Sequence, residues 1–248
     1  MKFHVLVTGR NLPNLLDRCL KSIKDSGFTD ITYCDDASSS EGVHPIDIAL
    51  QNNVHVLSIN ERGGPYVTRK LGLDYLIDHN YPDDLIVVFV DGDDTISKHT
   101  LSLLTDAYSK GNDSVFGGIN TPVWNNRAKD LLQKRINNIS FDWNYMCVPS
   151  LRSFKLKLYR DLLDMDPTCS LARTIDGTFC TKSTDTALFT PIQALCDQHK
   201  IEILNTTTYL YHPQPVDPNL PPIKRVEPGF SDRLNAMVLI HKNKNTRV

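Results

Sequence analysis

The sequence predicts an α/β protein with a mostly parallel central sheet flanked by helices. Two observations predict it. Short runs rich in Val and Ile alternate with helix-like segments through residue 118, and that alternation favours parallel strands joined by crossover helices. In addition, polar residues follow most of these runs. Because ligands bind at the carboxyl ends of the strands in open α/β sheets, these polar residues are candidates for a binding site.

The overall composition is that of an ordinary globular protein. Its 248 residues fit one domain with a sizeable core, and a net charge of −2 gives no electrostatic reason to expect a nucleic-acid partner. No apolar run approaches the roughly 18 residues of a transmembrane segment, and residues 1–7 are too short for a signal peptide. We therefore expect a cytoplasmic protein without a transmembrane segment. Its six cysteines show no Cys-x-x-Cys spacing, so we expect reduced thiols.

Five strands are predicted in the first half of the chain. They lie at residues 3–7, 30–34, 54–59, 85–90 and 114–116. Apolar residues at helical spacing predict the helices between them, at residues 12–23, 46–50, 65–77 and 98–108.

The second half is less regular. We expect a loop and a helix in residues 120–138, a strand at 139–148, and a basic amphipathic helix at 151–163. The basic face of that helix, expected to be solvated, consists of Arg152, Lys155, Lys157 and Arg160. A helix over 185–199 is interrupted by Pro191, and a strand at 201–211, a proline-rich stretch and a helix at 231–241 follow.

Three carboxylates follow the most apolar strand directly. Residues 85–90 form an unbroken apolar run, which predicts a strand buried on both faces. Asp91, Asp93 and Asp94 then lie at its carboxyl end, where they repel one another unless a cation such as Mg²⁺ or Mn²⁺ neutralises them. The alternative is an acidic turn that caps the next helix, with Thr95 or Ser97 as N-cap.

Polar residues also end the other early strands. Thr8, Gly9 and Arg10 follow the first strand, Asp35 and Asp36 the second, and Asn60, Glu61 and Arg62 the third. Carboxylates suit a base and a ribose, whereas arginines and metal-bound acids suit a diphosphate. The phosphate loop and the dinucleotide glycine fingerprint are both absent, which argues against a kinase and a nicotinamide dehydrogenase.

Four motifs in this order resemble a family 2 glycosyltransferase of the GT-A fold, the Rossmann-like fold of nucleotide-diphospho-sugar transferases. The motifs are Val5-Leu-Val-Thr-Gly-Arg-Asn11, Asp35-Asp-Ala-Ser38, Asn60 with Gly63-Gly-Pro-Tyr-Val-Thr-Arg-Lys-Leu-Gly72, and Phe89-Val-Asp-Gly-Asp-Asp94. The resemblance implies one GT-A domain over residues 1–248. Residues 1–118 would form its nucleotide-sugar half, 119–212 its acceptor half, and 213–248 a proline-rich segment and a C-terminal helix.

The resemblance also implies roles for individual residues. Thr8, Gly9 and Arg10 would line the nucleotide, Asp36 would bind the base, and Arg69 would lie near the diphosphate or sugar. Asp91 and Asp93 would form the DXD motif. In it Asp91 and Gly92 contact the nucleotide sugar, and Asp93 holds Mn²⁺ or Mg²⁺ with help from Asp91 and His212.

A carboxylate in the second half is the candidate general base. Residues 175–188 resemble the segment in which the family places its acceptor-side carboxylate, which makes Asp185 the candidate and Asp176 its rival. An acceptor hydroxyl must lose its proton as it attacks the anomeric carbon, and an ionised carboxylate can take that proton. The alternative is that Asp185 only caps its helix.

The resulting hypothesis is a metal-dependent, inverting hexosyl or deoxyhexosyl transferase. It would move a sugar from a nucleoside-diphosphate sugar, with UDP favoured, to a hydroxyl of a glycan or glycoprotein acceptor during polysaccharide or glycoprotein glycan biosynthesis.

Two other functions stay open. A haloacid-dehalogenase-type phosphatase would use Asp91 as nucleophile and Asp93 as acid and base with Mg²⁺. That motif normally begins its domain, however, whereas three strands precede it here. A GT-A-like module that only binds a glycan is the non-catalytic alternative.

Overall fold

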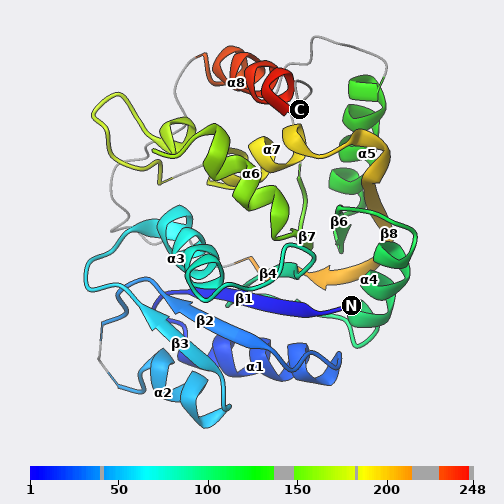
Figure 1. The fold of residues 1–248 in the computed structure, drawn as a ribbon. Helices are drawn as coiled ribbons and strands as arrows, with labels where there is room; N and C mark the ends of the chain where they lie inside the picture. Colours follow the sequence, from blue (N-terminus) through cyan, green and yellow to red (C-terminus); the bar gives the residue numbers. More distant parts are fainter. Residues whose placement is uncertain (40–41, 137–147, 182–183, 214–228, 246–248) are drawn as a thin grey trace.

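The computed structural model describes residues 1–39, 42–136, 148–181, 184–213 and 229–245, and one mixed sheet forms the centre of these residues (Figure 1). Its strands are β1 Phe3–Gly9, β2 Ile31–Asp35, β3 His55–Ser58, β4 Ile86–Asp91, β5 Thr95–Ile96, β6 Ser114–Ile119, β7 Arg152–Lys155 and β8 Ile201–Leu210. Their order across the sheet is β3-β2-β1-β4-β7-β6-β8-β5. Only β7 and β5 run against the other strands, so the predicted mostly parallel sheet is confirmed.

Helices cover both faces of the sheet (Figure 1). They are α1 Pro13–Asp25, α2 Pro45–Gln51, α3 Gly64–Asp78, α4 Thr100–Ser109, α5 Pro122–Ile136, α6 Lys157–Met165, α7 Thr184–Leu195 and α8 Phe230–Asn245, with short 3₁₀ turns η2 Ser170–Ala172 and η3 Gln198–Lys200. The apolar residues of α1, α2 and α4 form one buried cluster with the sheet. Those of α3, α6, α7 and α8 form another cluster on the opposite face.

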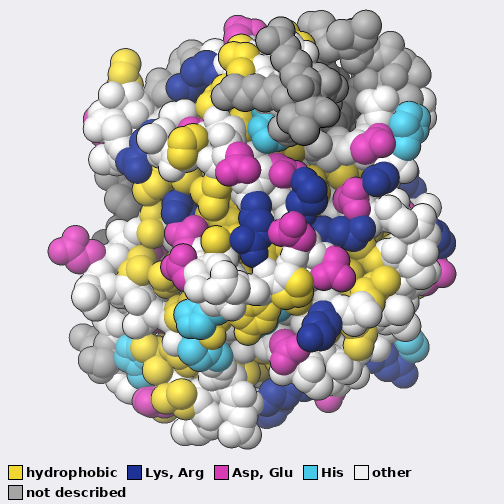
Figure 2. Space-filling model, in the orientation of Figure 1, with side chains coloured by type: hydrophobic (Ala, Val, Ile, Leu, Met, Phe, Trp, Pro, Cys, Tyr) yellow, Lys and Arg dark blue, Asp and Glu magenta, His cyan; other side chains and the backbone are white. Residues whose placement is uncertain are grey.

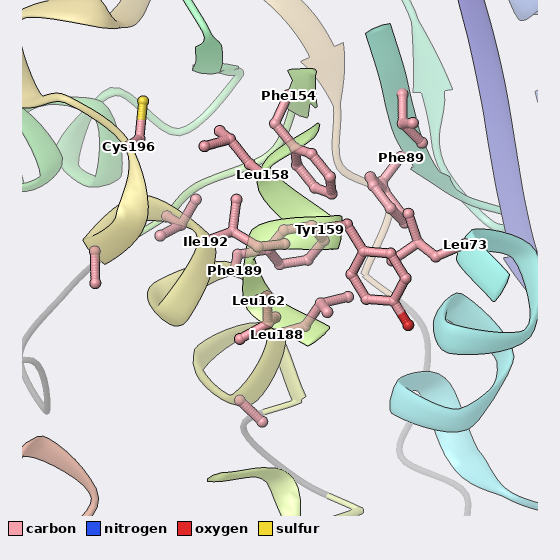
Figure 3. Close-up of a cluster of buried hydrophobic side chains, with 14 of the residues drawn as sticks. Leu73, Phe89, Phe154, Leu158, Tyr159, Leu162, Leu188, Phe189, Ile192 and Cys196 are labelled. Carbon is pink, nitrogen blue, oxygen red and sulfur yellow. The ribbon is translucent and has the colours of Figure 1, made fainter. Parts of the chain in front are cut away.

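The second cluster contains a layer of packed aromatic rings beneath the carboxyl edge of the sheet. Phe89 of β4 and Phe154 of β7 stack with ring centroids 5.5 Å apart, and Phe189 of α7 meets Phe89 edge-on at 5.1 Å. Figure 3 shows Phe189 between these sheet residues and the apolar side chains of α6 and α7. Burial of each such side chain contributes about 1.5–3 kcal/mol, so this layer holds α7 against the sheet.

The predicted basic helix at residues 151–163 is wrong at its start. The chain instead forms β7, which lies between β4 and β6, and α6 begins only at Lys157. Alternate side chains of β7 therefore face opposite layers. Phe154 enters the aromatic layer, while the Ser153 hydroxyl donates to the Val115 carbonyl at 2.8 Å. Arg152 is consequently buried, with 8% of its surface exposed, and not solvated.

The other three members of that basic face form ion pairs with carboxylates. The pairs are Lys155–Asp113, Lys157–Asp161 and Arg160–Asp83. Figure 2 shows such basic and acidic side chains interspersed across one side of the molecule. Paired charges of this kind are typical of a solvated surface.

Several other expectations can be compared with the structure. The 120–138 region is mainly the helix α5, and β5 was not predicted. The strand predicted at 139–148 lies almost entirely outside the described residues, and so does the proline-rich stretch from 214 onward. The five cysteines within the described residues are buried thiols that form no disulfide. In the described part of the chain, no helix combines the length and apolarity that crossing a bilayer requires.

His4 makes stability depend on pH. Its Nε2 lies 2.9 Å from the Thr32 hydroxyl, while its Nδ1 is buried without a partner in the described residues. Burial lowers the pKa of His4 to about 4, although the charge of Asp30 opposes the shift. Between pH 6.5 and 4 the unfolded chain binds a proton at His4 that the folded protein does not. We therefore expect the free energy of unfolding to fall, by up to about 3 kcal/mol, as the pH drops through this window.

Urea unfolding at pH 7 and pH 4.5 measures this effect. The His4→Gln variant should lose less stability between the two pH values than the wild type, whereas His99→Gln, at an exposed histidine, should behave like the wild type. Equal losses in wild type and His4→Gln would contradict the prediction.

Candidate functional site

The carboxyl ends of β1, β2 and β4 bring the predicted donor-side residues to one edge of the sheet. In the strand register Thr8 pairs with Asp91, and Gly9 pairs with Asp35. The N–H of Gly92 donates to the Thr8 carbonyl at 2.8 Å, and a Cβ on Gly92 would lie 3.1 Å from that oxygen. A residue without a side chain therefore suits this close approach between the ends of β1 and β4.

We call residues 91–94 the acidic loop. Of its three carboxylates, Asp91 is the one that arginine side chains hold. Arg69 Nη2 lies 2.8 Å from Asp91 Oδ1, and Arg152 Nη1 lies 3.9 Å from Oδ2. Burial alone would raise the pKa of Asp91, but the two guanidinium charges outweigh burial and lower it. Asp91 is therefore an ionised carboxylate whose charge is already balanced.

Asp94 is held by neutral donors. The Tyr209 hydroxyl donates to its Oδ2 at 2.7 Å, and the backbone N–H of His212 donates to its Oδ1 at 2.7 Å. Burial raises the pKa of Asp94 to about 7 in spite of these two bonds. The Tyr209 hydroxyl also accepts the N–H of Asp91 at 3.1 Å, so one phenol joins the acidic loop to β8.

His212 lies beside the acidic loop. Its Nε2 is 3.0 Å from the hydroxyl of Thr95, a residue of β5. Thr95 therefore does not cap the next helix. That helix, α4, begins at Thr100 after His99, and no side chain caps it within the described residues, since the Ser97 hydroxyl accepts the N–H of His99, which precedes the helix. The capping alternative for this turn is wrong.

Asp93 differs from its two neighbours. Within the described residues no salt bridge joins its carboxylate to a cation, although Arg18 Nη2 donates to its backbone carbonyl at 2.7 Å. Burial and then the negative charge of Asp91 raise the pKa of Asp93. Both effects disfavour an ionised Asp93 in the protein alone, and a bound cation would reverse them.

Two arginines connect Asp91 to Asp185. Arg69 Nη1 lies 2.8 Å from Asp185 Oδ1, and Arg152 Nη2 lies 2.9 Å from Asp185 Oδ2. Arg69 also reaches the hydroxyl of Thr184 at 3.2 Å. Two cations and two carboxylates thus form a closed cluster, which the structure builds from α3, β4, β7 and the first turn of α7.

The arginine cluster rests on Phe189. The guanidinium carbons of Arg69 and Arg152 lie 5.6 and 5.0 Å from the centroid of its ring, within the range of cation–π attraction. Arg69 is only 4% exposed, whereas the side chain of Asp185 is 44% exposed. The carboxylate is therefore open to solvent on one side and fixed by two buried cations on the other.

Asp36 connects the end of β2 to the start of α3. Its Oδ1 accepts the backbone N–H groups of Gly63 and Gly64 at 2.8 and 2.9 Å. Because α3 also carries Arg69, this carboxylate links the end of β2 to the helix that supplies the arginine cluster. Arg10 follows β1, half-buried, and its buried Nε has no partner in the described part of the chain.

The rival carboxylate Asp176 lies in a tight turn. Its Oδ1 accepts from the hydroxyls of Thr174 and Thr178, at 2.5 and 2.6 Å, and from the Thr178 N–H. No contact within the described residues joins it to the arginine cluster, so Asp185 is the acid that the cluster contains.

Sequence reasoning missed two residues of this region, Arg152 and Tyr209. Arg152 was assigned to a solvated helix face, yet Leu151, Ser153 and Phe154 around it are nearly fully buried, as in a central strand. Tyr209 lies in a segment predicted as a strand, but no local pattern marks its hydroxyl as a partner of Asp91 and Asp94. For Arg152, testing the short segment for strand periodicity could have found the signal.

The donor set fits a divalent cation shared with a ligand. Across the described ranges, no three His, Cys, Asp or Glu side chains gather as a metal-ligating group. Mg²⁺ and Mn²⁺ need fewer protein ligands when phosphate oxygens complete their coordination. Among the described residues the Asp93 carboxylate pairs with no cation, so it can bind a metal without losing a salt bridge, and His212 lies nearby. Asp91 would have to give up its arginine contacts to bind the metal.

Comparisons with known proteins complete the description. A family model described as glycosyl transferase family 2 matches residues 5–174. A fragment of TarS from S. aureus, solved with UDP-GlcNAc, is 20% identical with a TM-score of 0.59; the match covers 88% of this chain and 60% of that one. Glucosyl-3-phosphoglycerate synthase from Mycobacterium tuberculosis, solved with Mn²⁺, UDP and glucosyl-3-phosphoglycerate, is 13% identical with a TM-score of 0.54, over 97% of this chain and 79% of that one.

These structural matches establish the fold alone. This chain spans 36% to 65% of the lengths of the TarS chains that it matches. No curated protein sequence matches it.

Proposed function

The chain belongs to glycosyl transferase family 2 and has the GT-A fold, and from this premise we propose that it transfers a sugar from a UDP-sugar to an acceptor hydroxyl. The observation that carries the proposal is the bridge made by Arg69. This arginine contacts Asp91 and Asp185 at 2.8 Å each, so an acid of the proposed donor side and an acid of the proposed acceptor side share one cation. An enzyme that joins two substrates requires such proximity.

The donor would lie along the ends of β1, β2 and β4. We assign the nucleoside to Thr8, Gly9, Arg10 and Asp36, the ribose side to Asp91 and Gly92, and the diphosphate side to Arg69. The second oxygen of Asp36 can accept from a base while its Oδ1 holds α3. Solved relatives that contain UDP, UDP-GlcNAc or UDP-Glc support a uridine nucleotide.

Asp93 would hold the divalent cation, with His212 and Asp91 as further ligands. A bound Mn²⁺ or Mg²⁺ would neutralise the negative charge that develops on the leaving diphosphate. The relative solved with Mn²⁺ supports this assignment, and so does the uncompensated charge of Asp93.

Asp185 would act as the general base. As the acceptor oxygen forms its bond to the anomeric carbon, the hydroxyl proton passes to the Asp185 carboxylate. The bond between that carbon and the phosphate oxygen breaks, and its electron pair leaves with the diphosphate. Attack from the side opposite the leaving group inverts the anomeric centre. We propose a glycan or glycoprotein as acceptor; a cytoplasmic location likewise stays an expectation from the sequence.

The two alternatives are not favoured. A phosphatase would need Asp91 as a free nucleophile, but two arginines hold it, and the family match points elsewhere. A purely glycan-binding module gives no reason for a carboxylate, Asp185, fixed on one side and open to solvent on the other.

A thermal-shift panel tests the proposal. UDP, GDP, TDP and NAD are added separately, each with and without Mn²⁺. We expect UDP to raise the melting temperature only when Mn²⁺ is present, because the cation would bind the diphosphate together with Asp93. At 100 times its Kd, a ligand stabilises the folded state by about 2.7 kcal/mol. If no nucleotide binds and simple phosphate esters are hydrolysed, the phosphatase alternative replaces this proposal.

A further inference from the structure

Arg152 is unusually constrained for a long side chain. Its Nε donates to the Val148 carbonyl at 3.0 Å, its Nη2 donates to Asp185 Oδ2 at 2.9 Å, and its guanidinium lies over the ring of Phe189. It comes from β7, a strand hydrogen-bonded on both sides. Backbone, carboxylate and aromatic contacts therefore fix the guanidinium in one position.

The two arginines of the cluster are not equivalent. Arg69 makes two short contacts, one with Asp91 and one with Asp185. The short contact of Arg152 is with Asp185, and its distance to Asp91 is 3.9 Å. Loss of Arg69 would therefore disturb both acids, whereas loss of Arg152 would mainly release Asp185.

We propose that Arg152 is a positioning residue that acts through Asp185, a role that rests on the proposed function. With one oxygen on Arg69 and the other on Arg152, the Asp185 carboxylate cannot rotate, and its remaining lone pairs face solvent in a fixed direction. Arg152 thereby aims the proton acceptor without touching the substrate. Misplacement of a catalytic group by about 1 Å can cost roughly 100-fold in rate.

The test compares Arg152→Gln, Arg152→Lys, Arg69→Gln and Arg160→Gln with the wild type. Two quantities are measured: release of UDP from UDP-GlcNAc and UDP-Glc with water as acceptor, and the Kd for UDP in the presence of Mn²⁺. Arg160 is the matched control because it pairs with Asp83 at the other end of β4, and its replacement should change neither quantity.

We expect Arg152→Gln to lower kcat about 100-fold. The Kd for UDP should stay within about threefold, since a charge contact as loose as 3.9 Å contributes little. Arg152→Lys should recover part of the rate, because a single ammonium can hold Asp185 but cannot replace the fork of the guanidinium. Arg69→Gln should impair both kcat and UDP binding. In the Asp185→Asn background, Arg152→Gln should cause no further loss, as expected for residues that act as a unit.

The outcomes distinguish a positioning role from a structural role and from a role in donor binding. If Arg152→Gln melts at a lower temperature but keeps its kcat per folded molecule, the role is only structural and the inference is overturned. If its Kd for UDP rises as much as its kcat falls, Arg152 is a donor-binding residue and the inference is again overturned. If the wild type releases no UDP from either donor and binds no UDP, the proposed function itself fails.

Discussion

Replacement of Asp185 by Asn is expected to lower sugar transfer by about 10²–10⁴-fold while binding of UDP with Mn²⁺ persists. Asn has the size of Asp, and its one carbonyl oxygen can still accept a hydrogen bond from one of the two arginines, but its amide cannot take a proton from the acceptor. Arg69 remains paired with Asp91, so the donor side keeps its cation. UDP release from UDP-sugars, together with calorimetric titration of UDP, measures both parts of the prediction.

Asp176→Asn is the matched control for this experiment. Asp176 is the rival base from the same segment, and its carboxylate is engaged in the turn between Thr174 and Thr178. We expect it to keep the wild-type rate. A large loss of rate in Asp176→Asn with little loss in Asp185→Asn would assign the base to Asp176. Loss of both transfer and UDP binding in Asp185→Asn would reduce Asp185 to a structural anchor for the arginines.

Replacement of Asp93 by Asn should raise the melting temperature of the ligand-free protein and reduce the stabilisation by UDP and Mn²⁺. Burial and the charge of Asp91 raise the pKa of Asp93, which means that an ionised Asp93 destabilises the fold at neutral pH. The variant should therefore melt above the wild type without ligands. In the presence of UDP and Mn²⁺ it should lose the ligand stabilisation, about 2.7 kcal/mol at 100 times the Kd.

Melting curves with and without UDP, Mn²⁺ and both ligands measure this reversal. Asp84→Asn removes an exposed acid just before the other end of β4 and should change neither response. If Asp93→Asn keeps the full Mn²⁺-dependent stabilisation, the cation is held elsewhere, and Asp91 or His212 becomes the primary ligand.

The sequence predicted the fold of the first 118 residues well because the signals there are local. The apolar run at 85–90 became β4, with Ile86 to Val90 almost fully buried. The helical spacing of Leu16, Cys19, Leu20 and Ile23 became the buried face of α1. In both cases the residues that determine the structure are neighbours along the chain, so their periodicity alone was enough.

Arg152 and Tyr209 could not be assigned in the same way. The burial of Arg152 depends on Asp91 and Asp185, which lie 61 and 33 residues away in the sequence, and a guanidinium is buried only when such partners exist. The Tyr209 hydroxyl likewise finds Asp91 and Asp94 only after β8 joins the sheet. Local patterns carry no information about such distant partners.

The direction and pairing of β7 have a consequence for the accuracy of folding. Arg152 stands opposite Phe89 and Phe116, while Ser153 stands opposite Val88 and Val115. A slip of one residue along either neighbour would turn every side chain of this four-residue strand to the other face. The guanidinium would then enter the apolar layer that Val88 and Val115 line, and Asp91 and Asp185 would lose a shared cation. The charge balance of the arginine cluster therefore depends on the correct alignment of a strand of four residues, β7.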